Sequence, residues 1–354
     1  MVAEGGEVGV VRLMNQDKSK SPNVVVHEHR SRRDMSNTQT ALESHDVAIF
    51  QHEFGIFDGH DGKEIIAMMN PLTIPTIAVM HTVLSHPTPH QRYVMDQIIR
   101  RADALVTMTQ SGKDKLTARY HVNASQIHVL AHGARPMSRT SHPAFRHELK
   151  TRPRILTWGL IGPGKGLEWV IDALSELSDL PMKPEYVIAG QTHPNVKLRD
   201  GEQYRESLIE RIAEKNLQDS VRFIDRYLTE GELELLIASA DVIVLPYDSI
   251  EQVTSGVLVE AAVAGKPIIA TDFPHASEML SDGSGVLVQQ KDSSAIAKAL
   301  RKILTDADVA TQMKRQLEQK SNAFLWPVIG RRYLDLADSL LAKKRLAKSE
   351  YIAS

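Results

Sequence analysis

Residues 154–177 read RILTWGLIGPGKGLEWVIDALSEL, and this segment indicates the fold most clearly. It begins with a short apolar run that predicts a strand at Ile155–Trp158, and it ends in a helical pattern from Gly166 to Leu177. The residues between them, Gly159–Gly166, are rich in glycine. A strand, a glycine-rich loop and a helix in this order are typical of doubly wound α/β proteins, in which the loop meets a ligand.

Similar short apolar runs recur on both sides of this stretch, with amphipathic segments between them. The runs are nearly continuous rather than alternating, so they indicate strands covered on both faces, and a parallel sheet flanked by helices follows. The predicted strands are Val8–Leu13, Val24–His27, Val47–Gln51, Thr76–Met80, Ala104–Met108, Ile155–Trp158, Tyr186–Ala189, Val221–Ile224, Val242–Leu245, Ile268–Ala270 and Val286–Val288. The clearest helices are Gly166–Leu177, Tyr204–Asn216, Glu230–Ala238, Ser255–Ala264, Ser294–Leu304 and Val328–Leu341.

The length of the chain suits two domains. It has 354 residues, and a domain commonly holds about 100 to 200. Between the two series of strands, Ala134–Arg154 carries three prolines and six basic residues against one Glu, which indicates a linker. We therefore predict domains at residues 1–135 and 154–325, a linker at 136–153 and a final helical segment at 326–354.

Composition excludes several classes of function. The chain has 42 Lys and Arg against 44 Asp and Glu, which gives no general drive toward nucleic acid, because duplex binding depends on clustered basic residues. It has no cysteine, so disulfides, thiolate metal sites and a cysteine nucleophile are excluded. Met1–Gly9 lacks the pattern of a signal peptide, and no apolar run approaches the roughly 20 residues that span a bilayer. We expect a cytoplasmic protein with at most peripheral membrane contact.

The glycine-rich loop has the chemistry of a phosphate site. Its glycines, Gly162 and Gly164 among them, let backbone N–H groups approach an anion, and Lys165 adds a full positive charge beside a helix N-terminus. The loop also nearly matches the nucleotide P-loop, but Gly166 stands where that motif needs a Ser or Thr for Mg²⁺. This difference counts against an NTPase. The remaining alternative is a turn that only connects strand to helix.

A second strand–loop–helix corner lies at residues 245–261. Here Thr254, Ser255 and Gly256 precede a helix, and their backbone N–H groups predict a second anion-binding corner. Glu260 lies four residues after Gly256 and therefore on the same face of the helix. Its carboxylate is placed to accept hydrogen bonds from a ribose beside a bound diphosphate, or else it is an ordinary solvated helix residue.

Two sets of polar residues follow strands in the first half of the chain. His52 and Glu53 come after one predicted strand and His81 after the next, where open α/β sheets place ligands. A hydrogen-bonded structural role is the alternative for each histidine. No pair of histidines has the spacing of a zinc-protease helix, so we expect no metal.

Together these residues resemble the retaining glycosyltransferases of family 4, which have the GT-B architecture of two Rossmann-like domains facing across a cleft. The resemblance covers nearly the whole chain, and the order and spacing of its motifs are more specific than the fold. The motifs are Ala131–Gly133, Gly159–Gly166, Ala189-Gly190, Ala240–Tyr247, Gly256–Ala264, Gly265–Pro267 and Glu278.

The resemblance implies roles for the residues that match these motifs. Lys165 would stabilise the diphosphate leaving group, Glu260 would bind the ribose of the nucleotide, and His81 would contact the transferred sugar. The segment from Trp326 would cross back onto the first domain. The donor would also contact Gly162, Gly164, Gly190, Gln252, Thr254, Ser255 and Gly256.

The sequence departs from the family in three places. Leu160 stands where the family usually has Arg, so one cation for the diphosphate is missing. The acidic residue of the paired-Glu motif falls on Gln252, with Glu251 one place early. Val8–Leu13 looks like the family's second strand, so the first strand, its loop and the first helix are expected to be absent, which would interrupt the first sheet.

These observations favour a retaining glycosyltransferase. It would move a hexose from a nucleotide-sugar donor to a hydroxyl of a carbohydrate or glycolipid acceptor, without a metal or other cofactor. A sugar-nucleotide binder that is catalytically impaired by the incomplete N-terminal domain is the alternative.

Overall fold

The computed structural model describes residues 1, 5–13, 24–30, 32–137, 152–249, 251 and 253–353. Its contacts divide the chain into two compact units. Unit 1 contains Met1–His132 and Trp326–Ser354, and unit 2 contains Gly133–Leu325. The first boundary falls before residue 135 because Ala134 forms a parallel bridge with Leu325, and its N–H donates to the carbonyl of Phe324.

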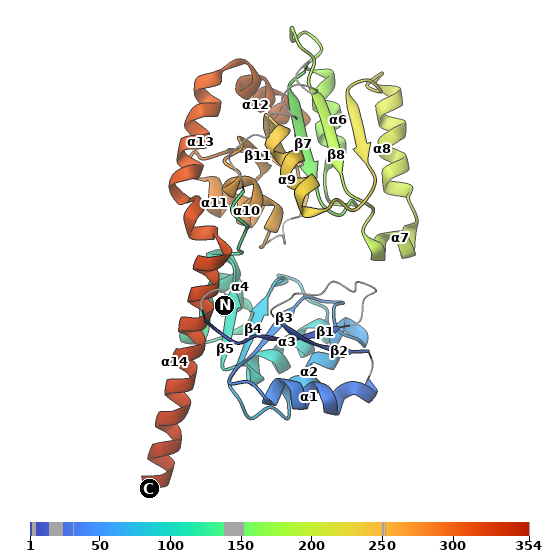
Figure 1. Cartoon of the computed structure of the whole chain (residues 1–354). Coiled ribbons are helices and arrows are strands. Elements are labelled where there is room, and N and C mark those ends of the chain that lie inside the picture. The colour runs from blue at the N-terminus through green and yellow to red at the C-terminus, as the bar shows by residue number, and fades with distance from the viewer. Residues whose placement is uncertain are drawn as a thin grey trace. The chain divides into compact units, whose positions relative to one another are not determined.

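Unit 2 is built on a single sheet of six parallel strands in the order β12-β11-β10-β7-β8-β9. Figure 1 labels β7, β8 and β11 of this sheet. The order reverses between β7 and β10, and in such sheets ligands bind beyond the carboxyl ends of the strands at this reversal. The strands are β7 (Arg154–Trp158), β8 (Glu185–Ala189), β9 (Val221–Ile224), β10 (Val242–Leu245), β11 (Ile268–Thr271) and β12 (Val286–Val288).

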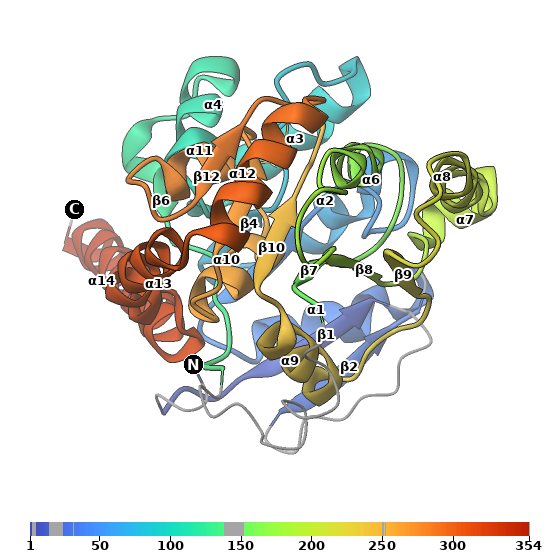
Figure 2. The same ribbon diagram turned by 90° about the horizontal axis from the view of Figure 1, so that it is seen from above.

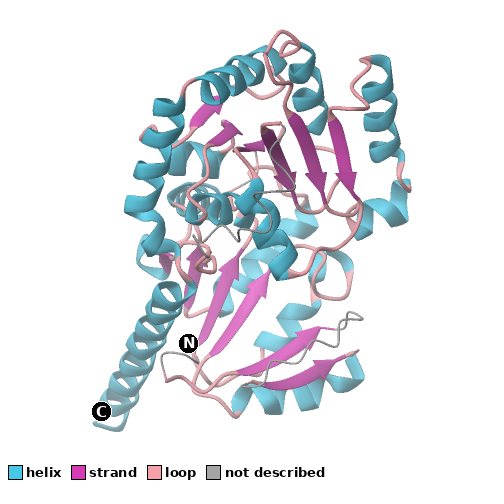
Figure 3. Cartoon of the chain, turned by 45° about the horizontal axis from the view of Figure 1, so that its top comes forward, coloured by secondary structure: helices cyan, strands magenta, loops and turns pink. Residues whose placement is uncertain are grey.

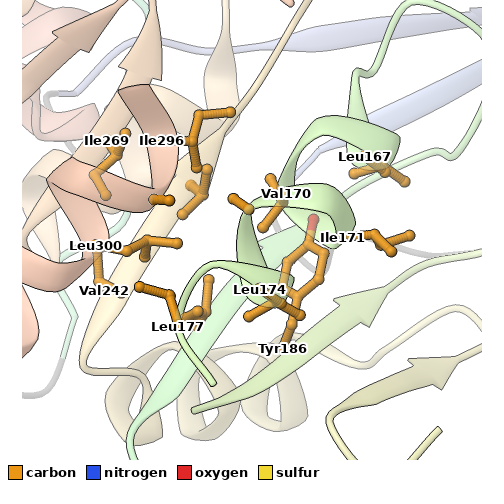
Figure 4. Packing of buried hydrophobic residues seen from close by; sticks show 14 of the residues in the cluster. Leu167, Val170, Ile171, Leu174, Leu177, Tyr186, Val242, Ile269, Ile296 and Leu300 are labelled. Carbon is orange, nitrogen blue, oxygen red and sulfur yellow. The ribbon is translucent and has the colours of Figure 1, made fainter. Parts of the chain in front are cut away.

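Helices cover both faces of this sheet. On one face, α6 (Leu167–Ser175) buries Leu167, Val170, Ile171 and Leu174, the spacing of one helix face, against Tyr186 of β8 (Figure 4). The opposite face carries a second apolar cluster that includes Leu258 and Val259 of α10. The other helices of the unit are α7 (Pro194–Asp200), α8 (Gln203–Glu214), α9 (Glu230–Ser239), α10 (Gly256–Val263), α11 (Pro274–Leu280), α12 (Ser293–Thr305) and α13 (Ala307–Ser321).

Unit 1 contains two separate parallel sheets (Figure 3). One has four strands in the order β3-β4-β5-β6, and the other pairs β1 with β2, which lie side by side in Figure 2. In the part of the chain that the structure describes, no ladder joins β1 to β3. The strands are β1 (Gly9–Leu13), β2 (Val25–His29), β3 (Ala48–His52), β4 (Thr76–Met80), β5 (Ala104–Thr107) and β6 (Ile127–Val129).

The four-stranded sheet of unit 1 is also covered on both faces. Leu336 and Leu340 of α14 pack with residues such as Ile77 and Val79 of β4. Residues of α2 and α3, such as Met68 and Ile98, form the core on the other side. The helices of the unit are α1 (Met35–Glu43), α2 (Glu64–Met69), α3 (Pro89–Arg101), α4 (Gln110–Tyr120) and α14 (Trp326–Ala353), with a 3₁₀ turn, η3, at His60–Gly62.

All the predicted strands are present within one or two residues of the expected bounds. The sequence missed only β6, because its three residues include His128 and give no continuous apolar run. Most of the expected linker, residues 138–151, lies outside the described residues. Among the residues that are described, no helix combines the length and apolar character needed to cross a membrane.

Candidate functional site

The glycine-rich loop follows β7 and is fixed by close backbone contacts. Gly166, with φ +65°, lies so near Pro246 that an added Cβ would be 1.8 Å from the carbonyl oxygen of Pro246. Gly190 lies in the same way against Gly159, where a Cβ would be 1.9 Å from the carbonyl oxygen. A hydroxyl side chain at position 166 is therefore excluded by geometry. This confirms the argument against a nucleotide P-loop.

Further bonds tie the loop to its neighbours. The N–H of Asp248 donates to the carbonyl of Gly164 at 3.0 Å, and Nε1 of Trp169 donates to the carboxylate of Asp248 at 2.9 Å. At the start of α6, the N–H of Leu167 donates to the hydroxyl of Tyr204. That N–H is therefore occupied, so the anion donors expected at this helix start are fewer than the sequence suggested. Gly164 has open space around it, while Gly162 is close to Val196.

Lys165 lies half-buried within this loop. Its Nζ is 4.4 Å from the centre of the Tyr247 ring, a cation–π contact. Burial lowers the pKa of Lys165, since removing an ammonium group from water disfavours its charged form. Lys165 forms no ion pair with any residue that the structure describes. Its charge is thus partly desolvated and available to a bound anion.

Glu260 is held in place by Trp158, the last residue of β7. Nε1 of Trp158 donates to Oε2 of Glu260 at 3.1 Å. Trp158 is buried, whereas Glu260 is partly exposed. The carboxylate therefore has one fixed partner and retains capacity to accept hydrogen bonds from a ligand. The sequence does not predict this role of Trp158, because it indicates only that the residue ends a strand.

The helix start at α10 differs from the expectation. Ser255 caps the helix by accepting from the N–H of Leu258, and its own N–H donates to Nδ1 of the buried His275 at 2.8 Å. The N–H of Ser255 is therefore not available to an anion, which corrects the sequence analysis. The N–H groups of Gly256 and Val257 have no partner among the described residues. Thr254 is buried, and Gln252 lies outside the described residues.

Unit 1 carries the expected histidines at the carboxyl ends of β3 and β4. Nε2 of His81 donates to Oε1 of Gln51 at 2.8 Å. Burial lowers the pKa of His81, and the charge of His132 lowers it further. His52 is completely buried, and burial lowers its pKa to about 4. Neither ring nitrogen of His52 has a hydrogen-bond partner in the part of the chain that is described. Both histidines are therefore neutral near pH 7.

Glu53 lies beside these histidines. Burial raises its pKa, although Oγ1 of Thr82 donates to its Oε2 at 2.6 Å and the N–H of Phe54 donates to Oε1. A carboxyl group with a raised pKa at a strand end is a candidate for proton transfer.

The predicted residues thus fall into two groups. Lys165, Glu260, Gly190 and Gly256 lie at the carboxyl ends of neighbouring strands in unit 2, and His81 lies in unit 1. The unit 2 group combines a half-buried cation, closely packed glycines and a positioned carboxylate. Such a group suits an anion joined to a polyol.

Comparisons with known proteins agree with this chemistry. The family model described as Glycosyl transferases group 1 matches residues 139–320. The chain is 25% identical over 265 residues to alpha-D-kanosaminyltransferase of Streptomyces kanamyceticus, an alignment that covers 70% of this chain and 65% of the relative. The chain therefore spans less than two thirds of that relative's length.

Solved structures share the fold. HepE from Anabaena, in complex with UDP-glucose, has a TM-score of 0.73 at 17% identity, covering 89% of this chain and 86% of that one. A trehalose-6-phosphate synthase, described in connection with glycosyltransfer with retention, has a TM-score of 0.75 at 13% identity, covering 96% and 94%. The parallel sheets and these likenesses confirm the GT-B fold expected from the sequence.

Proposed function

Since the chain belongs to the family Glycosyl transferases group 1, we propose that it transfers a hexose from a nucleotide-sugar donor to an acceptor hydroxyl, with retention at the anomeric carbon. One observation carries the proposal. Lys165 lies partly desolvated among the glycines of unit 2, with Glu260 fixed by Trp158 on an adjacent strand's helix. A diphosphate suits the cation, and the ribose hydroxyls of a nucleotide suit the carboxylate.

In this reaction the bond between the anomeric carbon and a diphosphate oxygen breaks, and the acceptor oxygen forms the new bond on the same face of the sugar. The diphosphate leaves with the electron pair, and its departing oxygen takes up the proton that the acceptor hydroxyl loses. Lys165 and the N–H groups of Gly256 and Val257 stabilise the negative charge that develops on the diphosphate. We take His81, which is neutral and is oriented by Gln51, as the residue of unit 1 that hydrogen-bonds the sugar.

The relatives support this assignment. The kanosaminyltransferase is a glycosyltransferase, and HepE binds UDP-glucose. The retention described for the trehalose-6-phosphate synthase favours the same stereochemistry here. We take Lys165 as the group that meets the diphosphate, so that no metal is needed for transfer.

The acceptor proposal rests on a cavity in unit 1. A cavity of about 340 Å³ adjoins His81 and His132, and most of its lining is apolar. Its apolar residues include Ile49, Met108, Ile329 and Tyr333. A glycolipid or another sugar derivative with an apolar group fits such a cavity better than a free sugar does. An alkyl glycoside should therefore have a lower KM as acceptor than the corresponding free sugar.

The decisive experiment measures donor binding and turnover together. A panel of nucleotide sugars, starting with UDP-glucose, is tested for thermal stabilisation and for release of nucleoside diphosphate in the presence of acceptors. A ligand at about 100 times its Kd adds roughly 2.7 kcal/mol of stability. Lys165→Ala should weaken binding of the nucleoside diphosphate about 10- to 100-fold and leave nucleoside binding unchanged. Equal losses for both ligands would contradict the role of Lys165.

The impaired binder is the second candidate, and the separation of β1 and β2 from the four-stranded sheet of unit 1 favours it. It predicts donor binding like that of an active enzyme, with no transfer to any acceptor. Analysis of the anomeric configuration of a product by NMR separates retention from inversion.

A further inference from the structure

Three side chains converge in unit 1, away from the strand ends described above. His60 and Asp61 belong to the 3₁₀ turn η3, and His90 is the second residue of α3. Nδ1 of His60 lies 2.8 Å from Nδ1 of His90 and 3.1 Å from Oδ2 of Asp61. The third side of the triangle, from Nδ1 of His90 to Oδ2 of Asp61, is 2.8 Å.

While Asp61 is ionised, protons alone cannot satisfy this triangle. If both nitrogens carry hydrogen and donate to the carboxylate, the two N–H groups face each other. If only one nitrogen carries hydrogen, the lone pair of the other faces the negatively charged oxygen. Each arrangement leaves one repulsive contact at hydrogen-bond distance. A cation at the centre removes the conflict, because all three atoms then direct lone pairs at positive charge.

The separations suit one metal ion. Zinc binds imidazole nitrogen at about 2.0–2.1 Å and carboxylate oxygen at about 2.0–2.2 Å. Ligand atoms at such distances, about 90° to 110° apart around the ion, lie roughly 2.9–3.4 Å from one another. Small side-chain rotations bring the observed triangle into this range. His60 is 72% exposed, so solvent can fill the remaining positions.

The ligand types indicate which cations bind. Two imidazoles and one carboxylate suit Zn²⁺ and its first-row neighbours, whereas Mg²⁺ and Ca²⁺ prefer sites made of oxygen.

The backbone holds the ligands toward one another. Asp61 has left-handed φ and ψ of 52° and 28°, and the N–H of Gly62 donates to the carbonyl of Gly59 across the turn. His90 stands in the first turn of α3, which is fixed by a capping box between Thr88 and Gln91. The partial positive charge at this helix end opposes a cation weakly, and the full negative charge of Asp61 outweighs it.

We propose that His60, Asp61 and His90 bind a single divalent first-row transition cation, with Zn²⁺ as the best match. The ion joins the turn after β3 to the helix after β4, and thereby stabilises the segments that follow His52 and His81. It is structural and takes no part in transfer. The site could not be predicted from the sequence, because the two histidines are 30 residues apart.

The experiment uses the whole chain, freed of any histidine tag, treated with chelator and dialysed. Titration with ZnCl₂, by calorimetry and by competition with a chromophoric chelator, gives the affinity and stoichiometry. We expect one tight site per chain. His90→Ala and Asp61→Asn should each weaken it by more than about 100-fold, above the roughly 10- to 100-fold caused by loss of an outer-shell partner.

His86→Ala is the matched control, because His86 is an exposed histidine four residues before His90. It should bind Zn²⁺ like the wild type, and Co²⁺ should give visible absorption bands in both that are absent from His90→Ala. Asp61→Asn keeps the shape of the turn, and circular dichroism checks that each variant is folded. Equal Zn²⁺ affinity in His90→Ala and His86→Ala would mean scattered binding by surface histidines and would overturn the proposal. So would the absence of a site in the wild type. Neither result would bear on sugar transfer.

Discussion

The two units place polar groups at the ends of parallel strands by different means. In unit 2 the glycine-rich loop is fixed by the backbone, with Gly166 packed on Pro246 and Gly190 packed on Gly159. In unit 1 the groups are held by burial, as His52 lies completely inside without a hydrogen-bond partner among the described residues. Backbone contacts give a rigid corner for a charged ligand. Burial keeps the histidines of unit 1 neutral near pH 7, so that their protonation depends on pH.

The largest expected effect tests the rigidity of unit 2. Gly190→Ala places a Cβ 1.9 Å from the carbonyl oxygen of Gly159, so we expect it to destabilise unit 2 by more than about 3 kcal/mol. Gly164→Ala is the control, since Gly164 also has positive φ but open space around it. The Gly164→Ala substitution should lower the free energy of unfolding by about 1–2 kcal/mol. Urea unfolding followed by tryptophan fluorescence measures both. Similar losses in the free energy of unfolding for the two variants would contradict the role given to the close contact between Gly190 and Gly159.

The next effect tests burial in unit 1 through pH. The folded state lowers the pKa of His52 from 6.5 to about 4, so between these values the unfolded chain binds more protons. The contribution of His52 to stability is complete above pH 6.5 and falls as the pH falls toward 4. Between pH 7 and pH 5 the loss is about 2 kcal/mol.

The variant His52→Phe isolates this contribution. It keeps a ring beside Phe54 and removes the titrating group. The other histidines titrate in both proteins, so the difference between the two stability curves belongs to His52. We expect the variant to lose less stability than the wild type between pH 7 and pH 5. Parallel curves would show that burial does not control this histidine.

A smaller effect concerns the side-chain hydrogen bond from Trp158 to Glu260 in unit 2. Trp158→Phe removes the hydrogen bond to Glu260, a loss of about 1.5 kcal/mol. Binding of a ribonucleoside diphosphate should weaken about 10-fold, and its KM as donor should rise more than kcat changes. A 2′,3′-dideoxy analogue lacks the hydroxyls that Glu260 would bind, so its affinity should stay the same. A similar loss for the analogue would mean that Trp158 acts only through packing.

The smallest expected effect concerns the pKa of Glu53 in unit 1. Thr82→Val removes a hydrogen bond that opposes the rise in the pKa of Glu53. The pKa of Glu53 should therefore rise further in the variant. A carboxyl with a raised pKa loses its contribution to stability as pH rises through the folded value. The variant should therefore be less stable than the wild type at pH 7 by below about 1 kcal/mol, with little difference at pH 4. NMR titration of the Glu53 carboxyl measures the shift directly, and an unchanged pKa would contradict it.

Sequence predicted the parts of this molecule that depend on neighbours along the chain. Continuous apolar runs located the strands, and the glycine pattern located the loop of unit 2. The pattern also identified Gly166, whose missing side chain matters because a carbonyl occupies that space. Local sequence is enough for these features because the apolar pattern of a strand and the conformational freedom of a glycine depend on consecutive residues.

Contacts between distant residues could not be predicted in this way. Trp158 and Glu260 are 102 residues apart, and nothing in either segment indicates the other. The N–H of Ser255 donates to Nδ1 of His275, 20 residues away in the sequence, so a donor predicted to be free is occupied. Hydrogen-bond partners depend on which strands become neighbours. That order, with β10 beside β7, became visible only in the structure.

The position of α14 in the chain has a consequence for biosynthesis. This helix covers one face of the β4 and β5 sheet, yet residues 133–325 of unit 2 are synthesised between that sheet and the helix. At about 5–20 residues per second, the ribosome needs roughly 10–40 s for this interval. During that time Ile77, Val79 and Val106 lack their covering helix, so nascent unit 1 presents an apolar face on which a chaperone could act. Unit 2, whose residues are consecutive, can complete its fold first.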